Sequence, residues 1–235
     1  MDEAKSEKPK ISEVTSIISH QLKTPLAGIK SSLEVLLSGD LGELDPPQRE
    51  YVALALDSSE KMIALVKNLL ETSKIDEDRL ELKRQKTNIT ALIDAVVSEL
   101  AQFAQAKNTK IDVEIGADLP ELTVDPVKIH EVIENIVMNA IRYSKGKGSV
   151  KLTLKRDGDR VIFSCRDTGV GISDEDRKKI FSKFYRSPRV MTLAPEGSGL
   201  GLYISKAIIE KSGGAVWFES ADGSGTTFYF SLPIQ

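Results

Sequence analysis

The sequence has little of what several classes of protein require. It contains one cysteine, Cys165, and two distant histidines, His20 and His130, so we expect neither a disulfide framework nor a structural metal site. It lacks an apolar run of about 18 residues, and residues 1–10 are polar, so neither a membrane span nor a secretory signal is expected. A net charge of −3 disfavours a broad basic face for nucleic acid. These absences predict a protein of the reducing cytoplasm whose present segment contacts neither nucleic acid nor membrane.

Two glycine clusters are the most informative feature that is present. Asp167-Thr-Gly-Val-Gly-Ile172 comes first, and Gly197-Ser-Gly-Leu-Gly-Leu202 leads into a helical pattern, where backbone N–H groups favour anions. Neither cluster is a dinucleotide fingerprint, because Asp174 and Leu202 stand where its last glycine belongs. Neither is a Walker loop, because Leu-Tyr follows Gly201 in place of Lys-Ser/Thr. The pair predicts a nucleotide site of another type.

An amphipathic helix is predicted before these clusters. Apolar residues recur at helical spacing between Ile129 and Ile141. Asn135 and Asn139 are four residues apart and therefore share one face of this helix. Asparagine is disfavoured inside helices, and its amide oxygen is a hard, neutral ligand suited to Mg²⁺ in a nucleotide site. A pair of solvated surface amides is the alternative interpretation.

A second candidate for chemistry is His20, in Ser19-His-Gln-Leu-Lys-Thr-Pro-Leu26. Ile18 and Leu22 belong to two neighbouring apolar heptad rows, and His20 falls beside them toward solvent. An imidazole that is partly neutral near pH 7 and accessible to a γ-phosphate is a suitable nucleophile, although an exposed surface histidine is the alternative. Pro25 is expected to kink the helix after this turn. His130 opens the later helix and is interpreted as a surface residue.

The first part of the chain is predicted to be a helical hairpin. Residues 11–38 and 48–74 have long helical patterns, and glycines and prolines mark the turn between them. Each helix carries an apolar stripe that two helices alone cannot bury. A four-helix bundle formed by two chains is therefore expected, and a single hairpin packed on the following domain is the alternative.

The rest of the chain is predicted to form an α/β domain. A charged linker spans residues 76–86, with a short strand suggested by Leu80, Leu82 and Gln85, and the second domain spans 87–235. The helices expected in it are 89–106, 125–143 and 199–212, and the strands are 109–115, 149–155, 160–167, 215–219 and 226–232. Hairpin-paired strands with interleaved helices indicate a two-layer sandwich rather than a doubly wound parallel sheet. Residues 186–197 are predicted to be a mobile loop over the nucleotide site.

In type, order and spacing, these segments resemble the conserved boxes of sensor histidine kinases. The corresponding H, N, G1, F, G2 and G3 elements are Ser19–Leu26, Ile129–Ser144, Asp167–Gly171, Phe181-Ser-Lys-Phe-Tyr185, Gly197–Gly201 and Gly225-Thr-Thr-Phe228. The resemblance implies a dimerisation and phosphotransfer hairpin over residues 11–75, followed by an ATP-binding domain of the GHKL/Bergerat type.

The resemblance also implies ATP and Mg²⁺ as ligands and gives residues their roles. It places Mg²⁺ on Asn139 with Asn135 beside it, phosphate and base near Arg142 and Tyr143, and the adenine amine on Asp167. The other implied ATP-binding residues are Gly169, Gly171, Arg186, Gly197, Gly199, Leu200, Gly201 and Thr226.

The implied reaction is autophosphorylation of His20 and transfer to an aspartate of a response-regulator receiver domain. Thr24, on the face of His20, has the implied role of orienting water when the regulator is dephosphorylated, and whether this phosphatase activity accompanies the kinase is open at this point. A homodimer, the receiver domain and an upstream or separate sensor module are the implied partners.

One position departs from the family pattern. Gln21 stands where most members carry Asp or Glu after the histidine, and an amide cannot take a proton from the imidazole at neutral pH. The alternative function is therefore an ATP-binding dimeric scaffold, or a phosphatase, with weak autokinase activity. Two further alternatives share the nucleotide fold: chaperone or DNA-repair ATPases, which carry Glu where Asn135 stands, and anti-sigma serine kinases, which lack the hairpin.

Overall fold

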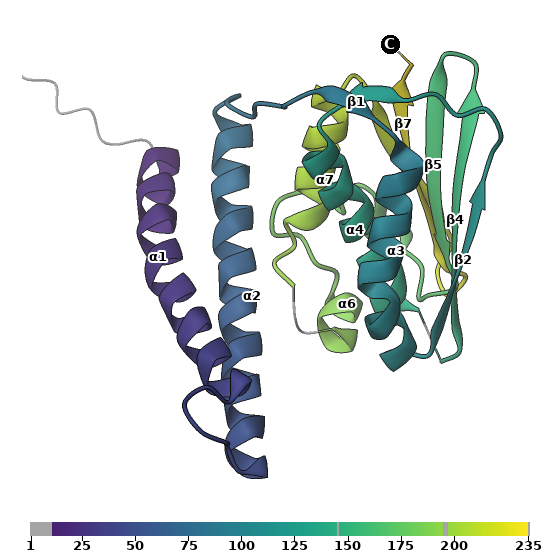
Figure 1. Cartoon of the computed structure of the whole chain (residues 1–235). Helices are drawn as coiled ribbons and strands as arrows, with labels where there is room; N and C mark the ends of the chain where they lie inside the picture. The colour runs from purple at the N-terminus through teal and green to yellow at the C-terminus, as the bar shows by residue number, and fades with distance from the viewer. Residues whose placement is uncertain (1–10, 145, 195–196, 235) are drawn as a thin grey trace, which may run out of the picture. The chain divides into compact units, whose positions relative to one another are not determined.

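The computed structural model describes residues 11–144, 146–194 and 197–234, with side chains from residue 21 onward. The chain divides into two compact units, and the boundary between them falls between Leu80 and Glu81 (Figure 1). Among the described residues, no helix combines the length and apolarity needed to cross a membrane.

The first unit is the predicted helical hairpin of α1 (Ile11–Ser38) and α2 (Pro46–Asp76). A capping box begins α2, because the side chain of Asp45 accepts from the Gln48 N–H at 2.8 Å and the Gln48 side chain accepts from the Asp45 N–H at 3.0 Å. Prolines in the first turn of a helix sacrifice no intrahelical hydrogen bond, which explains why α2 begins at Pro46 rather than at residue 48. Pro25 lies inside α1 and does not end it.

The two helices bury only part of their apolar surface against each other. Leu26 is buried, and its carbonyl accepts a hydrogen bond from Ser59 Oγ at 3.3 Å, while Lys30 pairs with Glu60 at 2.8 Å. Several large apolar side chains on the same helices are exposed: Leu22, Ile29, Tyr51, Leu54, Met62 and Leu65. This exposed stripe is the feature for which a bundle of two chains was expected.

The second unit is a five-stranded sheet in the order β2-β4-β5-β7-β6, together with a separate β1-β3 pair. Its strands are β1 (Gln85–Thr87), β2 (Thr109–Ile115), β3 (Leu122–Val124), β4 (Gly148–Asp157), β5 (Arg160–Asp167), β6 (Ala215–Ser220) and β7 (Thr226–Pro233). Its helices are α3 (Ile89–Ala106), α4 (Pro126–Tyr143), α5 (Asp174–Arg177), α6 (Pro188–Leu193) and α7 (Gly201–Lys211). Among the strand pairings of the described residues, β2–β4 is the only parallel one.

The long helices α3, α4 and α7 lie on one face of this sheet, so the predicted two-layer sandwich is confirmed (Figure 1). The apolar face of α4, from Ile129 to Ile141, is fully buried there, and Phe163 of β5 stacks on Phe230 of β7 at 4.8 Å between ring centroids. Asp125 fixes the start of α4, because its carboxylate accepts from the N–H groups of Val127 and Lys128 at 3.1 Å.

Several predicted boundaries were wrong. The strand suggested near Leu80 and Leu82 is β1, which begins only at Gln85, because its partner β3 spans just three residues. Nothing in the sequence indicated β3. The last long helix begins at Gly201 rather than at residue 199, because Gly199 adopts a positive φ of 70°.

Candidate functional site

Asp167 is the centre of the candidate site in the second unit. It ends β5 with only 6% of its surface exposed. Its Oδ1 accepts from the N–H of Gly169 at 2.7 Å and from the N–H of Thr226 at 3.2 Å, whereas Oδ2 receives no hydrogen bond from the described residues. Burial raises the pKa of this carboxyl group to about 6, and the two backbone hydrogen bonds oppose the rise. One oxygen is fixed in place and the other is available as an acceptor.

Two glycines allow the backbone to close tightly around this carboxylate. A Cβ at Gly169 would lie 2.4 Å from the carbonyl oxygen of Tyr143, which closes α4. A Cβ at Gly171, where φ is 69°, would lie 2.1 Å from the carbonyl oxygen of Ala221. The first glycine cluster therefore joins the end of α4 to the β6–β7 loop, and both contacts exclude a side chain.

The hydroxyl of Ser220 connects the same segments and was not predicted from the sequence. It accepts from the N–H of Ile172 at 2.9 Å, donates to the carbonyl of Gly225 at 2.9 Å, and lies 2.9 Å from the hydroxyl of Thr226. Thr226 is buried, and its own N–H donates to Asp167 Oδ1.

The two asparagines of α4 lie in different surroundings. Asn135 Nδ2 donates to Ser205 Oγ of α7 at 3.0 Å, and a Cβ at Gly201 would lie 2.2 Å from Asn135 Oδ1. Asn139 is half-buried, and its side chain makes no hydrogen bond within the described part of the chain. Asn135 is thus held against α7, whereas the amide of Asn139 is available to a ligand.

These residues fit a nucleotide-bound Mg²⁺ rather than a protein-only metal centre. The described residues contain no group of three His, Cys, Asp or Glu side chains that could hold a metal. Mg²⁺ at nucleotides takes few protein ligands and keeps phosphate and water oxygens, so one available amide oxygen suits it. The side chains of Arg142 and Tyr143, in the last turn of α4, are half-buried and likewise make no hydrogen bond within the described residues.

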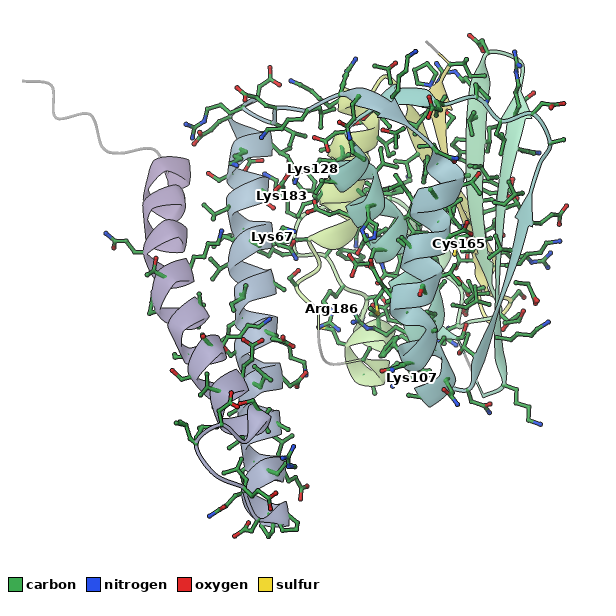
Figure 2. All side chains as sticks on the ribbon, viewed as in Figure 1. Lys67, Lys107, Lys128, Cys165, Lys183 and Arg186 are labelled. Carbon is green, nitrogen blue, oxygen red and sulfur yellow. The ribbon has the colours of Figure 1, made fainter. Side chains whose placement is uncertain are left out.

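The segment predicted as a loop, residues 186–197, contains the short helix α6, so that prediction was wrong for Pro188–Leu193. Ser187 caps this helix, because its hydroxyl accepts from the Val190 N–H at 3.3 Å. Arg186 donates to the carbonyl of Ala194, and Figure 2 shows it beside α6. Pro195 and Glu196 lie outside the described residues.

The second glycine cluster joins this segment to α7. A Cβ at Gly197 would lie 3.7 Å from the Arg186 guanidinium, and one at Gly199 would lie 2.7 Å from the backbone of Phe184. The Leu200 side chain is fully buried, so of this residue only the backbone is available to a ligand. N–H groups of this cluster precede and begin α7, where an anion is favoured.

The remaining predicted residues belong to the first unit. His20 lies within α1, but its side chain is outside the described residues. Gln21 and Thr24 are exposed on the same helix. His130, on α4, lies 3.2 Å from Glu99 of α3 and is not part of the carboxylate-centred site.

Comparison with known proteins identifies both units. Residues 124–235 match the family described as "Histidine kinase-, DNA gyrase B-, and HSP90-like ATPase", and residues 10–78 match the "His Kinase A (phospho-acceptor) domain". Sensor protein kinase WalK of Staphylococcus saprophyticus is 32% identical over 227 residues, which are 95% of this chain and 36% of that protein. Adaptive-response sensory kinase SasA of Synechococcus sp. is 33% identical over 223 residues, which are 94% of this chain and 59% of that protein.

Solved structures show the same similarity. Full-length ShkA in complex with AMPPNP matches with a TM-score of 0.77 and 29% identity, over 94% of this chain and 45% of that one. Histidine kinase ThkA in complex with the response regulator protein TrrA matches with a TM-score of 0.64 and 25% identity, over 95% of this chain and 61% of that one. The chain therefore spans between about one third and three fifths of the length of these relatives.

Proposed function

The chain belongs to the sensor histidine kinases, and from this premise we propose that it transfers the γ-phosphoryl group of ATP to His20 and then to an aspartate of a response-regulator receiver domain. In this proposal residues 11–75 form the dimerisation and phosphotransfer hairpin, residues 76–86 are the linker, and residues 87–235 bind ATP.

The buried carboxylate of Asp167 carries the proposal for the nucleotide. Its Oδ1 is fixed by the N–H groups of Gly169 and Thr226, so Oδ2 is the oxygen that accepts the exocyclic amine of adenine. Guanine presents a carbonyl at that place and would bring two acceptors together, which is unfavourable in a buried site. In this proposal the base lies close to the backbone of Gly169 and Gly171, and the Thr226 hydroxyl makes a water-mediated contact with it.

The phosphates are assigned to the C-terminal half of α4 and to the second glycine cluster. Asn139 would hold Mg²⁺, with Asn135 beside it, and the bound ion would neutralise phosphate charge during transfer. Arg142 lies one turn further along α4, and Arg186 supplies a second cation from the segment before α7. N–H groups from Gly197 to Gly201 face the phosphates at the start of α7.

The proposed reaction is nucleophilic substitution at phosphorus. A lone pair on a ring nitrogen of His20 forms the N–P bond as the bond from the γ-phosphorus to the β–γ bridging oxygen breaks, and ADP leaves. In the second step a receiver aspartate carboxylate oxygen attacks the phosphorus and the His20 nitrogen departs. Phosphoryl transfer needs mainly positioning and charge neutralisation, so the nucleophile and the nucleotide can belong to separate units.

The partners follow from the hairpin. Its exposed apolar stripe favours a homodimer in which two hairpins form one four-helix bundle. The surface around His20 is the proposed docking site of the receiver domain, and a sensor module, upstream or separate, would control the activity.

A second candidate function rests on Gln21. This exposed amide follows His20 and cannot act as a proton acceptor, so the chain could be an ATP-binding dimeric scaffold, or a phosphatase using Thr24, with weak autokinase activity. A Gln21→Glu variant separates the two candidates: a large gain in autokinase rate supports the second, and an unchanged rate shows that position 21 does not limit the reaction.

The test is incubation with γ-labelled ATP and Mg²⁺, followed by acid and alkali treatment of the labelled protein. We expect acid-labile, alkali-stable label that disappears in His20→Ala and in Asn139→Ala and persists in the matched control His130→Ala. Bound ATP without label would move the function to the second candidate, and label that survives acid would indicate a hydroxyl acceptor.

A further inference from the structure

A groove in the second unit takes no part in the proposed nucleotide site. It has a volume of about 570 Å³ and lies between the C-terminal half of α3, the start of β2 and the start of β4. Its lining includes the small or aliphatic side chains of Val97, Ala101, Ala104 and Ile111. Polar side chains share the lining, among them Gln105, Asn108 and Thr109, and the groove is open to solvent, so a ligand there would keep one side exposed.

The rim of this groove is basic. Lys110 and Lys147 line it, and no acidic residue does. Lys110 is already paired with Asp112 at 2.6 Å, whereas Lys147 makes no ion pair with any described residue. Lys147 is therefore the cation available to an anionic group, and it lies just before β4.

The helix end at this groove limits where an anion can bind. The last carbonyl groups of α3 carry a partial negative charge, which disfavours an anion there. Lys107 follows the last turn of α3 (Figure 2). Its ammonium group lies 6.0 Å from the centre of the Phe103 ring. The favourable place for a negative head group is thus beside Lys147, with an apolar body along Ala101 and Ala104.

A short series of contacts connects the groove to the adenine end of the nucleotide site. Gly148 lines the groove, and a Cβ at this position would lie 2.6 Å from Ser144 Cβ. Ser144 forms a β-bridge with Gly169, whose N–H donates to Asp167 Oδ1 at 2.7 Å. If a ligand displaced Gly148, Ser144 and then Gly169 would move with it. The N–H group that holds Asp167 Oδ1 would therefore shift.

From this juxtaposition we propose that the groove is a second ligand site, for a small anionic amphiphile such as a carboxylate with an aliphatic or aromatic body, and that its occupancy changes nucleotide affinity. The linkage is reciprocal: the factor by which the amphiphile changes nucleotide affinity equals the factor by which nucleotide changes amphiphile affinity. Binding in the groove requires neither His20 nor phosphoryl transfer, whereas the linkage rests on the proposed nucleotide site.

The test uses octanoate as the probe on the whole chain, with ¹⁵N-resolved amide shifts as the readout. We expect saturable shifts at the end of α3 and the start of β2, with octylammonium of the same length producing none. Lys147→Glu should weaken octanoate binding about tenfold, because an attraction becomes a repulsion of similar size. Lys155→Glu, the same charge reversal at the far end of β4, should leave binding unchanged.

A second variant tests the apolar part. Ala101→Phe fills the groove from an exposed helix position, so we expect loss of octanoate binding with the fold intact, while Gln102→Phe, one residue further along α3 and outside the lining, retains it. Equal binding of octanoate by all four variants, or no saturable binding at all, would overturn the site.

The linkage is tested separately, by measuring octanoate affinity with and without the non-hydrolysable nucleotide AMPPNP. An identical affinity would overturn the linkage. Failure of AMPPNP itself to bind would count against the proposed function and not against the groove.

Discussion

Replacing Asp167 with Asn separates the function of this carboxylate from its cost to the fold. Burial raises its pKa from 3.8 to about 6, which means that the ionised form is disfavoured in the folded chain. A shift of about two units corresponds to about 3 kcal/mol of differential free energy. Asparagine has nearly the same shape, keeps an oxygen that can accept from Gly169 and Thr226, and carries no charge.

The sign of the pH dependence follows from proton binding. Below about pH 4 the carboxyl group is protonated in both the folded and the unfolded chain, so its burial does not lower the free energy of unfolding. Between about pH 4 and pH 6 the unfolded chain releases the proton first, so the free energy of unfolding falls as pH rises. Above about pH 6 the group is ionised in both the folded and the unfolded chain, so the loss in free energy of unfolding no longer changes with pH. Asp167→Asn should therefore be more stable than the parent by about 1–3 kcal/mol at pH 7.5, and the difference should shrink toward zero near pH 4.

The assay is urea unfolding at pH 7.5, 5 and 4, followed by tryptophan fluorescence. Trp217 is the only tryptophan in the chain and lies in β6, so its signal reports the unit that contains Asp167. The same variant should lose at least tenfold in ATP affinity, because the amide donates where the adenine amine requires an acceptor. A variant that is less stable than the parent at pH 7.5, or a difference that does not shrink in acid, would refute the reasoning.

Three other outcomes are expected. Ser205→Ala removes the 3.0 Å hydrogen bond to Asn135 and should cost about 1 kcal/mol and weaken Mg²⁺-dependent nucleotide binding by calorimetry, whereas unchanged binding would show that Asn135 needs no such support. Gly171→Ala places a Cβ 2.1 Å from a carbonyl oxygen and should lower the urea midpoint far more than Gly223→Ala, which has a similar φ of 76° but open space; equal effects would contradict the contact. Leu54→Glu, at an exposed position of the hairpin stripe, should convert the expected dimer to a monomer in sedimentation experiments, unlike the control Ala53→Glu; a persistent dimer would place the interface elsewhere.

Strong periodicity made the long helices predictable. The apolar positions of α4 recur from Ile129 to Ile141, and the same seven residues that form this pattern are buried against the sheet. The glycine clusters were equally informative, because contacts such as that of Gly171 with the Ala221 carbonyl tolerate no side chain. Both signals are formed by residues close together in the chain, so they can be recognised from a single sequence.

The unpredicted features depend on contacts between distant residues. Ser205 supports Asn135 from 70 positions away, and Ser220 joins the segments of Ile172 and Thr226, yet a serine in a helix or strand carries no pattern that indicates either role. The strand β3 has three residues, which are too few for an alternation of polar and apolar residues to be recognised. It is defined by its pairing with β1. The pKa of Asp167 likewise arises from burial between β5 and its neighbours and not from the residues next to it in sequence.

The most direct test of the central claim is to locate the phosphoryl group after reaction with ATP and Mg²⁺, by mass spectrometry of peptides kept at alkaline pH. The proposed function predicts phosphohistidine at His20, at a level that depends on Asp167 and Asn139. Phosphate on His130 or on a hydroxyl residue, or an unmodified chain with ATP bound at the Asp167 site, would contradict it.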